Sequence, residues 1–346
     1  MHVTTIGLDI AKRVFQAHGV NERAQAVLRK PLRRAQVMPF FAQLSPCLIG
    51  IEACGSAHFW ARQLSTLGHT VKLMPPQFVK PYVKTNKNDA HDAEAICEAV
   101  GRPNMRFVPV KTIDQQAVLA LHRAREGFVA ARTAQANQIR GLLGEFGIVM
   151  PEGIHVLKEQ MPQILEDAEN GLPGASRELF ARLIEHLREL DRRVKDLQRQ
   201  IETWHHNSAP SQRLEQIPGI GPLTASALVA SIGDIRTFRN ARQLSAWLGL
   251  VPRQDSSGGQ TRLLGISKRG DSYLRKLLIH GARAVLSRLK RRPGDADWRT
   301  RLLARRPANV AAVALANKNA RIVWALLARD RDYHPGYGMK SLATPA

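Results

Sequence analysis

We expect the chain to fold as an α/β domain followed by a mostly helical remainder, and three observations predict this division. The first hundred residues alternate short apolar runs with amphipathic stretches, a pattern typical of a sheet covered by helices. From about residue 114 the apolar residues recur at helical intervals over long stretches. The 346 residues, 44% of them hydrophobic, can bury more than one core. We predict an α/β domain at 1–110, a helical region at 111–208 and a C-terminal domain at 209–346.

Within the α/β domain, three strand-like runs come first. VTTIGLDI, RVFQAHGV and QAVLRK are separated by charged or polar turns and predict an antiparallel meander. A helix over RRAQVMPFFAQL, a strand in CLIGIEA, a helix over GSAHFWARQLSTLG and a strand in TVKLM follow, before Pro75 and Pro76. Three strands, helix, strand, helix, strand is the order of ribonuclease-H-like folds.

Four acidic residues stand where this fold would bring them together. Asp9 and Glu52 end two neighbouring apolar strands, where an acid is costly to desolvate unless it is paired or binds a metal. Asp89 and Asp92 share one face if NDAHDAEAICEAV is a helix, although alone they are also ordinary first-turn acids. Four converging carboxylates predict a site for Mg²⁺ or Mn²⁺ and phosphodiester chemistry.

The charge of the chain points to a polyanionic partner. It has 51 Lys and Arg against 29 Asp and Glu, a formal net charge of +22. Residues 251–346 hold 20 Lys and Arg, six Asp and no Glu, so we expect this end to contact nucleic-acid phosphates. A solvated basic surface or a patch for anionic membrane is the alternative.

The sequence predicts a cytoplasmic, nucleoid-associated protein without a membrane partner. No run of about 18 apolar residues appears, and the N-terminus lacks a basic-then-apolar signal pattern. Cys47, Cys54 and Cys97 lack metal-ligand spacing, which fits a reducing compartment and structural or incidental thiols.

Two long helices are expected in the middle of the chain. The stretch from 114 to 147 carries Arg123, Arg125, Arg132 and Arg140 among small apolar residues, and a Pro/Gly-rich break near 151–175 follows. The second helix has an apolar seam with alternating spacings of three and four. The seam consists of Phe180, Leu183, Leu187, Leu190, Val194, Leu197, Ile201 and Trp204. An intramolecular hairpin and a coiled coil between two chains both suit this seam, and we favour an antiparallel hairpin that also helps the protein to oligomerise.

Two motifs follow the second helix. Pro218-Gly219-Ile220-Gly221 resembles the turn of a helix-hairpin-helix element, which grips a phosphate through backbone N–H groups; an ordinary helix connection is the alternative. Ser256 and Ser257 then precede two glycines. Five cations surround the serines in the sequence, an environment suited to a phosphate-attacking hydroxyl, although Ser and Gly are also common turn residues. These cations are Arg253, Arg262, Lys268, Arg269 and Arg275.

Five ordered motifs resemble those of the bridge-RNA-guided DEDD insertion-sequence transposases, a family related to the pilin-gene site-specific invertases. They are GLDIAK, IEACG, KNDAHDAEAI, QIPGIGPLTA and LGLVPRQDSSGG with GISKRGDSYLRKLLIHGARA, and the resemblance covers about residues 3–330. It implies an N-terminal domain similar to a Holliday-junction resolvase, a coiled-coil insertion and a C-terminal domain with a catalytic serine. The family serine precedes a glycine, which matches Ser257, while Ser256 beside it keeps the choice open.

We therefore expect a site-specific DNA recombinase that excises and inserts a mobile element. Ser257 would form a covalent 5′-phosphoserine link to double-stranded DNA at the element ends and target, while the acidic quartet holds Mg²⁺. The resemblance further implies a noncoding guide RNA and dimers that pair into tetramers. One alternative is a metal-dependent junction resolvase without a covalent intermediate, and another is a non-enzymatic RNA-binding protein.

Overall fold

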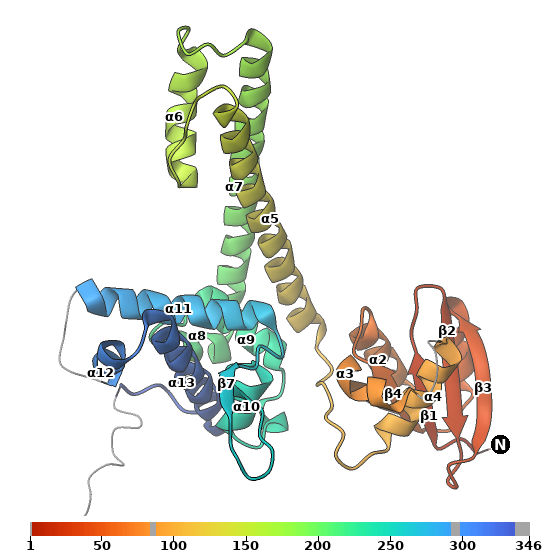
Figure 1. Ribbon diagram of the computed structural model, residues 1–346. Coiled ribbons are helices and arrows are strands. Elements are labelled where there is room, and N and C mark those ends of the chain that lie inside the picture. Colours follow the sequence, from red (N-terminus) through yellow and green to blue (C-terminus); the bar gives the residue numbers. More distant parts are fainter. Residues whose placement is uncertain (1, 84–87, 292–297, 336–346) are drawn as a thin grey trace, which may run out of the picture. The chain divides into compact units, whose positions relative to one another are not determined.

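The computed structural model describes residues 2–83, 88–291 and 298–335, and it divides into two compact units (Figure 1). The N-terminal unit is Met1–Thr112 and the C-terminal unit is Ile113–Ala346. The finer division of the second unit, into a helical region at 111–208 and a domain at 209–346, stays a prediction. Its last residues, 336–346, lie outside the described residues.

A five-stranded sheet with the order β3-β2-β1-β4-β5 forms the centre of the N-terminal unit. The first three strands pair antiparallel, which confirms the predicted meander, and β4 and β5 run parallel to β1. The strands are β1 (Thr5–Asp9), β2 (Val14–Val20), β3 (Ala26–Arg33), β4 (Leu48–Glu52) and β5 (Thr70–Met74). Parallel β1 and β4 therefore both end at the same edge of the sheet, with an acid on each.

The two faces of this sheet are covered by different helices. Phe15 on β2 packs edge-on against Trp60 of α2 (Ala57–Thr66), with ring centroids 5.0 Å apart, in the apolar core that α1 (Val37–Ala42) also joins. Helix α4 (Asp89–Val100) lies on the opposite face. Three short elements complete the unit: η1 (Arg34–Gln36), α3 (Pro76–Val79) and η2 (Lys80–Tyr82).

The C-terminal unit begins with a long helical hairpin. Helices α5 (Ile113–Gly144) and α7 (Gly174–His206) run antiparallel side by side (Figure 1). Arg125 near the start of α5 donates to Gln198 near the end of α7, and Arg132, further along α5, bonds Asp191 at 2.7 Å. The apolar seam of α7 is thus largely buried within one chain, as in the hairpin alternative. Association of hairpins from two chains stays a prediction.

The predicted Pro/Gly-rich break at 151–175 is wrong over half its length, because α6 (Ile154–Glu166) lies there. Buried Leu157 and Met161 pack against the far end of the hairpin, so tertiary contacts stabilise a helix that tolerates Pro162 inside it. Lys158 of α6 also bonds Asp191 at 2.7 Å, opposite the Arg132 contact. The hydrogen bond from Lys158, against the opposing effect of burial and with the further help of Arg132, holds the pKa of the Asp191 carboxyl well below its usual range, at about 2.

The rest of the unit is a cluster of helices around one apolar core. The turn at Pro218 packs tightly here: the side-chain amide of buried Asn319 donates to the Pro218 carbonyl at 2.9 Å. Gly219 meets Gly281 backbone to backbone. The elements are α8 (Ala209–Glu215), α9 (Pro222–Ile232), η3 (Ile235–Thr237), α10 (Ala241–Trp247), β6 (Pro252–Gln254), β7 (Leu263–Ile266), α11 (Ser272–Arg291), α12 (Trp298–Arg305) and α13 (Ala308–Arg329).

Helix α13 is, among the described residues, the one helix long and apolar enough to cross a membrane by length and composition. Its residues Ala312, Leu315 and Ala316 are buried in the core of the C-terminal unit. A core helix passes the same test, so this helix is weak evidence for a membrane span.

Candidate active sites

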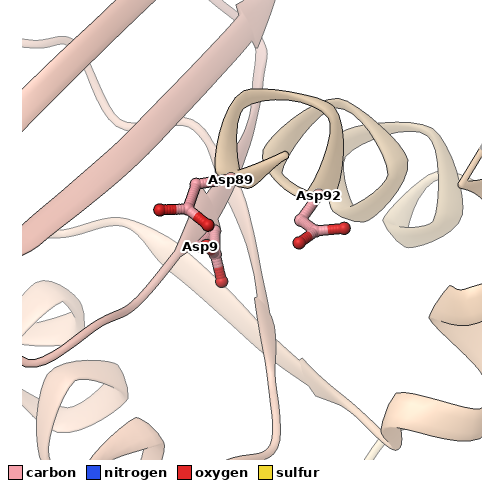
Figure 2. Close-up of side chains that lie close together, drawn as sticks. All are labelled: Asp9, Asp89 and Asp92. Carbon is pink, nitrogen blue, oxygen red and sulfur yellow. The ribbon is translucent and has the colours of Figure 1, made fainter. Parts of the chain in front are cut away.

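A cluster of carboxylates forms at the edge of the sheet in the N-terminal unit. Asp9 ends β1, and Asp89 and Asp92 lie in the first turn of α4, where Figure 2 shows the three side chains converging. One carboxylate oxygen from each lies within 4.8 Å of the others. The fold therefore brings these three predicted residues together, although β1 and the start of α4 are about eighty residues apart in the chain.

Glu52, the fourth predicted acid, ends the strand next to Asp9. Leu8 and Ile51 are paired in the parallel ladder of β1 and β4, so the acid that follows each lies at the same edge. The negative charge of Glu52 acts on Asp9 electrostatically. Glu52 thus borders the three-aspartate cluster, and the expectation that β1 and β4 place the two acids side by side is confirmed.

The electrostatics of the cluster favour a bound cation. Burial, followed by the charges of Asp92, Asp89 and Glu52, raises the pKa of Asp9 from 3.8 to about 6, against a smaller lowering effect of the Ile10 backbone N–H. A carboxylate that gains a proton so readily is one that a metal ion would stabilise in its ionised form. The donor set is all oxygen and strongly anionic, which is what Mg²⁺ or Mn²⁺ requires.

The start of α4 fixes the direction of its two aspartates. Asn88 is the N-cap, and its side-chain oxygen accepts a hydrogen bond from the Ala90 backbone N–H at 3.0 Å. Asp89 and Asp92 follow in the first turn, on the side facing Asp9. The helix dipole favours both charges there, which offsets part of their mutual repulsion.

Cys54 stands two residues after Glu52 and is exposed, yet its chemistry is unsuited to attack on phosphorus. Although the residue is exposed, partial desolvation of the thiol, followed by the charges of Glu52 and Asp9, raises its pKa above the ordinary value. The thiolate is the nucleophilic form of cysteine, so a raised pKa lowers its reactivity at neutral pH.

The serine pair lies at the tip of a β-hairpin in the C-terminal unit. Strands β6 and β7 pair antiparallel, and Ser257 bridges Gln260 across a two-residue turn. Gly258 and Gly259 have φ angles of 55° and 79°, which a tight turn of the I′ type requires and side chains disfavour. The turn is consistent with the Ser and Gly residues there, but neither strand is predicted above, although two consecutive glycines are a recognisable hairpin signal.

The two serine hydroxyls differ in their bonding. The Ser256 oxygen accepts from the Gln254 side-chain amide at 2.9 Å and from the Arg262 backbone N–H at 3.2 Å. The Ser257 hydroxyl makes no hydrogen bond within the part of the chain that the structure describes, and the residue is exposed. Ser256 therefore stabilises the base of the turn, whereas Ser257 presents its hydroxyl to solvent.

The five predicted cations fall into two groups. Arg253, Arg262, Lys268 and Arg269 are exposed on or next to the hairpin. Arg275 is half-buried, and its guanidinium donates to the Leu248 carbonyl at 3.1 Å. The four exposed side chains are therefore open to an anionic ligand. Arg275, the fifth, connects α11 to the end of α10.

Other predicted arginines take part in the helical hairpin. Arg125 and Arg132 bond α7, as described above, and Arg140 donates to the backbone carbonyls of Pro151 and Gly153. Arg123 is exposed. Three of the four predicted arginines of α5 therefore form hydrogen bonds within the C-terminal unit, a role that the sequence alone did not indicate.

A Ser-His-acid arrangement elsewhere in the unit is structural. His205 Nδ1 lies 2.8 Å from Ser211 Oγ and its Nε2 lies 2.9 Å from Glu215 Oε2. Ser211 and His205 have no exposed surface, so no substrate reaches the hydroxyl. The network joins the end of α7 to α8.

Two family models match this chain. The model described as "Transposase IS116/IS110/IS902 family" matches residues 211–298, which include the serine hairpin. A model described as "Transposase", for the IS110 DEDD type, matches residues 6–148, which include all four acids.

Individual proteins are similar over almost the whole length. A "Probable family 20 transposase" of Pseudomonas aeruginosa is 56% identical over 97% of this chain and 100% of its own. The transposase for insertion sequence element IS1328 of Yersinia enterocolitica is 45% identical, over 94% of this chain and 97% of its own. The transposase for IS1111A of Coxiella burnetii is 45% identical as well, over 96% of this chain and 92% of its own.

Proposed function

This chain belongs to the IS116/IS110/IS902 transposase family, and we propose that it excises and inserts a mobile DNA element through a covalent link to Ser257. Members of the family are DNA-cleaving and DNA-transferring enzymes. The proposal concerns how this chain performs the chemistry, and it assigns separate roles to the carboxylate cluster and to the serine hairpin.

The observation that carries the proposal is the contrast between the two serines. Ser256 is held by two hydrogen bonds, whereas Ser257 is exposed on a hairpin that also carries the exposed Arg253 and Arg262. Those cations suit a DNA phosphate and the extra negative charge that develops on it during attack. Ser257 is therefore the better nucleophile, in line with the family pattern of a serine before glycine.

The proposed step balances as a transesterification. Ser257 Oγ bonds to the phosphorus of the scissile phosphate, the bond from phosphorus to the 3′ oxygen breaks, and the serine proton leaves to a base while the 3′ oxygen gains one. The product is a 5′-phosphoserine link and a free 3′ hydroxyl. The reaction can run in reverse when the 3′ hydroxyl of a new strand attacks the link and releases the serine. Energy of the phosphodiester is retained in the link, so no cofactor is consumed.

The carboxylate cluster would hold Mg²⁺ or Mn²⁺ through Asp9, Asp89 and Asp92, with Glu52 at its border. Such an ion supplies charge neutralisation at a phosphate and lowers the pKa of bound water or hydroxyl. The residues themselves exclude other anions from this edge of the sheet until a cation is present. The strand order and the position of the acids support a ribonuclease-H-like, resolvase-like assignment of this unit.

The two sites lie in different compact units, about 165 residues apart in sequence. We propose that they act together in an assembly of dimers and tetramers on DNA, with a noncoding RNA guiding target choice. The resemblance in motifs supports both partners, and the basic C-terminal unit supports nucleic-acid binding in general. The turn at Gly219 is a further candidate contact to a phosphate backbone.

The test is a search for the covalent link. Full-length protein, purified with the RNA that accompanies it, is mixed with duplex DNA spanning an element end and run on a denaturing gel. We expect a protein–DNA adduct that Ser257→Ala abolishes and Ser256→Ala only reduces, since loss of the Ser256 hydroxyl loosens the turn. Loss of the adduct in Ser256→Ala but not in Ser257→Ala would show that Ser256, and not Ser257, is the nucleophile.

Two other outcomes correspond to the alternatives. Free cleaved strands without any adduct, in wild type and both serine variants, would indicate a metal-dependent junction resolvase. RNA binding without cleavage under any condition would favour a non-enzymatic RNA-binding protein.

A further inference from the structure

Strand β2 places Gln16 beside Asp9, on the side opposite Glu52. Asp9 and Gln16 are direct partners in the antiparallel ladder of β1 and β2. Side chains of directly opposed residues lie on the same face of a sheet with their Cβ atoms about 5 Å apart. Gln16, Asp9 and Glu52 therefore form a row across three strands, on the face that carries the carboxylate cluster.

The neighbours of Gln16 on β2 show that it stands at the rim of this face. His18, two residues on, is buried under α4 and is close enough to Glu94 for their charges to interact. Val14, two residues before, is 43% exposed. Gln16 lies between these two environments and is half-buried, at the point where the cover of α4 ends and the cluster begins.

The side-chain amide of Gln16 is available to a ligand. Within the described part of the chain, its side chain makes no hydrogen bond, although it is half-buried. The amide keeps contact with solvent, because neither its oxygen nor its nitrogen is among the buried side-chain atoms that lack a hydrogen-bond partner. An amide held ready beside an acidic cluster is therefore a candidate for a ligand that binds there.

A primary amide suits a phosphate at this position. Ionised carboxylates only accept hydrogen bonds, so four of them offer nothing to phosphate oxygens. The NH₂ group of Gln16 donates without adding a charge or displacing a cation from the carboxylates. We propose that Gln16 donates a hydrogen bond to a non-bridging phosphate oxygen of the DNA strand held at the cluster, which makes it a substrate-binding residue.

This inference rests on the proposed role of the cluster in DNA cleavage, and two variants test it. Gln16→Met keeps the length of the side chain and removes the donor, while Gln16→Asn keeps the amide and shortens the reach. The control is Gln43→Met, because Gln43 is exposed and precedes β4 at the opposite edge of the sheet.

The first measurement is binding of an element-end DNA duplex with Ca²⁺ in place of Mg²⁺, so that affinity is read without cleavage. We expect Gln16→Met to weaken binding about tenfold, as for one lost hydrogen bond to a charged group. Gln16→Asn should fall between it and wild type, and Gln43→Met should bind as wild type does. Equal affinity of Gln16→Met and wild type would overturn the inference.

The second measurement is the Mg²⁺ dependence of cleavage. We expect Gln16→Met to cleave more slowly with an unchanged half-saturating Mg²⁺ concentration. A loss that extra Mg²⁺ fully restores would mean that Gln16 acts on the metal, and it would overturn the inference. Failure of the proposed role of the cluster gives a different result from failure of the Gln16 inference. If the cluster has no role in cleavage, Asp9→Asn cleaves DNA at the wild-type rate.

Discussion

Gly7 on β1 and Gly50 on β4 are paired in the sheet, and helix α4 lies across both of them. A Cβ atom on Gly7 would come within 2.1 Å of the Ala93 carbonyl oxygen, and one on Gly50 within 2.8 Å of the Val100 Cβ. Each glycine stands two residues before an acid of the site, on the same face. The missing side chains let α4 approach the sheet closely and so carry Asp89 and Asp92 to the strand ends.

Gly7→Ala should therefore disrupt the cluster as well as the packing. The added methyl group meets backbone atoms that cannot rotate away, so we expect a loss of about 1–3 kcal/mol in the free energy of unfolding, measured in urea. Gly101→Ala, just after the same helix, is the control, because its Cβ would meet nothing within 4 Å. A Gly7→Ala protein with wild-type stability and wild-type cleavage would contradict the role given to this contact.

Asp9→Asn should stabilise the metal-free protein while abolishing DNA cleavage. The folded pKa of about 6 lies above the ordinary 3.8, so the ionised carboxylate destabilises the fold at neutral pH. After discounting for solvent screening, we expect a gain of about 1–2 kcal/mol at pH 7 that disappears below pH 4.

Addition of Mg²⁺ provides the matching measurement. It should raise the melting temperature of wild type and leave Asp9→Asn almost unchanged, because a ligand stabilises only the state that binds it. Asp114→Asn, an exposed acid in the C-terminal unit, should respond to Mg²⁺ as wild type does. Equal shifts in wild type and Asp9→Asn would remove Asp9 from the metal site.

The exposed and half-buried cations near the serine hairpin should behave differently. Arg269→Ala and Arg253→Ala should weaken binding to all DNA sequences and lower the slope of log affinity against log salt by about 0.9 per lost phosphate contact. Arg275→Ala should instead lower stability, because its guanidinium holds the Leu248 carbonyl. Salt titrations of binding and urea unfolding of each variant check both effects. A slope unchanged in the first two variants would place these residues on a solvated surface.

His122 should make the stability of the C-terminal unit sensitive to pH. The side chain of His122 is 1% exposed. The Ser226 hydroxyl donates its proton to the Pro222 carbonyl, so its oxygen accepts a hydrogen bond from His122 Nε2 at 3.1 Å. Its Nδ1 then accepts from the Tyr273 hydroxyl at 3.0 Å. A neutral ring satisfies both contacts, and the buried site penalises the charged, protonated ring.

Burial, with a smaller effect of Arg125, lowers the pKa of His122 from 6.5 to about 4. The unfolded chain binds the proton first, so stability is full above pH 6.5 and falls by about 3 kcal/mol as the pH drops to 4. We expect His122→Gln to flatten this dependence in urea unfolding at several pH values, whereas exposed His280→Gln should not. The same pH dependence in His122→Gln and wild type would contradict the assignment.

The amino-acid sequence alone predicted most of the secondary structure of the N-terminal unit and pointed to four acids, of which the structure brings Asp9, Asp89 and Asp92 together. The predicted strands and helices of residues 3–100 are confirmed, because period-two and period-3.6 patterns agree there with local turn residues, whereas the short α3 and η2 were not predicted. Sequential connections account for the pairs β1–β2, β2–β3 and β4–β5, but β4 pairs with β1 and not with β3, an arrangement expected from the ribonuclease-H-like order, and this pairing brings Asp9 next to Glu52. The family assignment is also a property of the sequence, since it depends on ordered motifs.

Tertiary structure decided what depends on contacts between distant residues. Helix α6 forms despite Pro162 because Leu157 and Met161 are buried, and the intramolecular hairpin follows from bonds such as Arg132 with Asp191. Ser256 and Ser257 have the same local chemistry in the sequence, and only the folded hairpin engages one hydroxyl and leaves the other open. Likewise the register of two strands, and no motif, brings Gln16 beside Asp9. Burial and pairing are set by the whole fold, because each needs a partner that the local sequence does not contain.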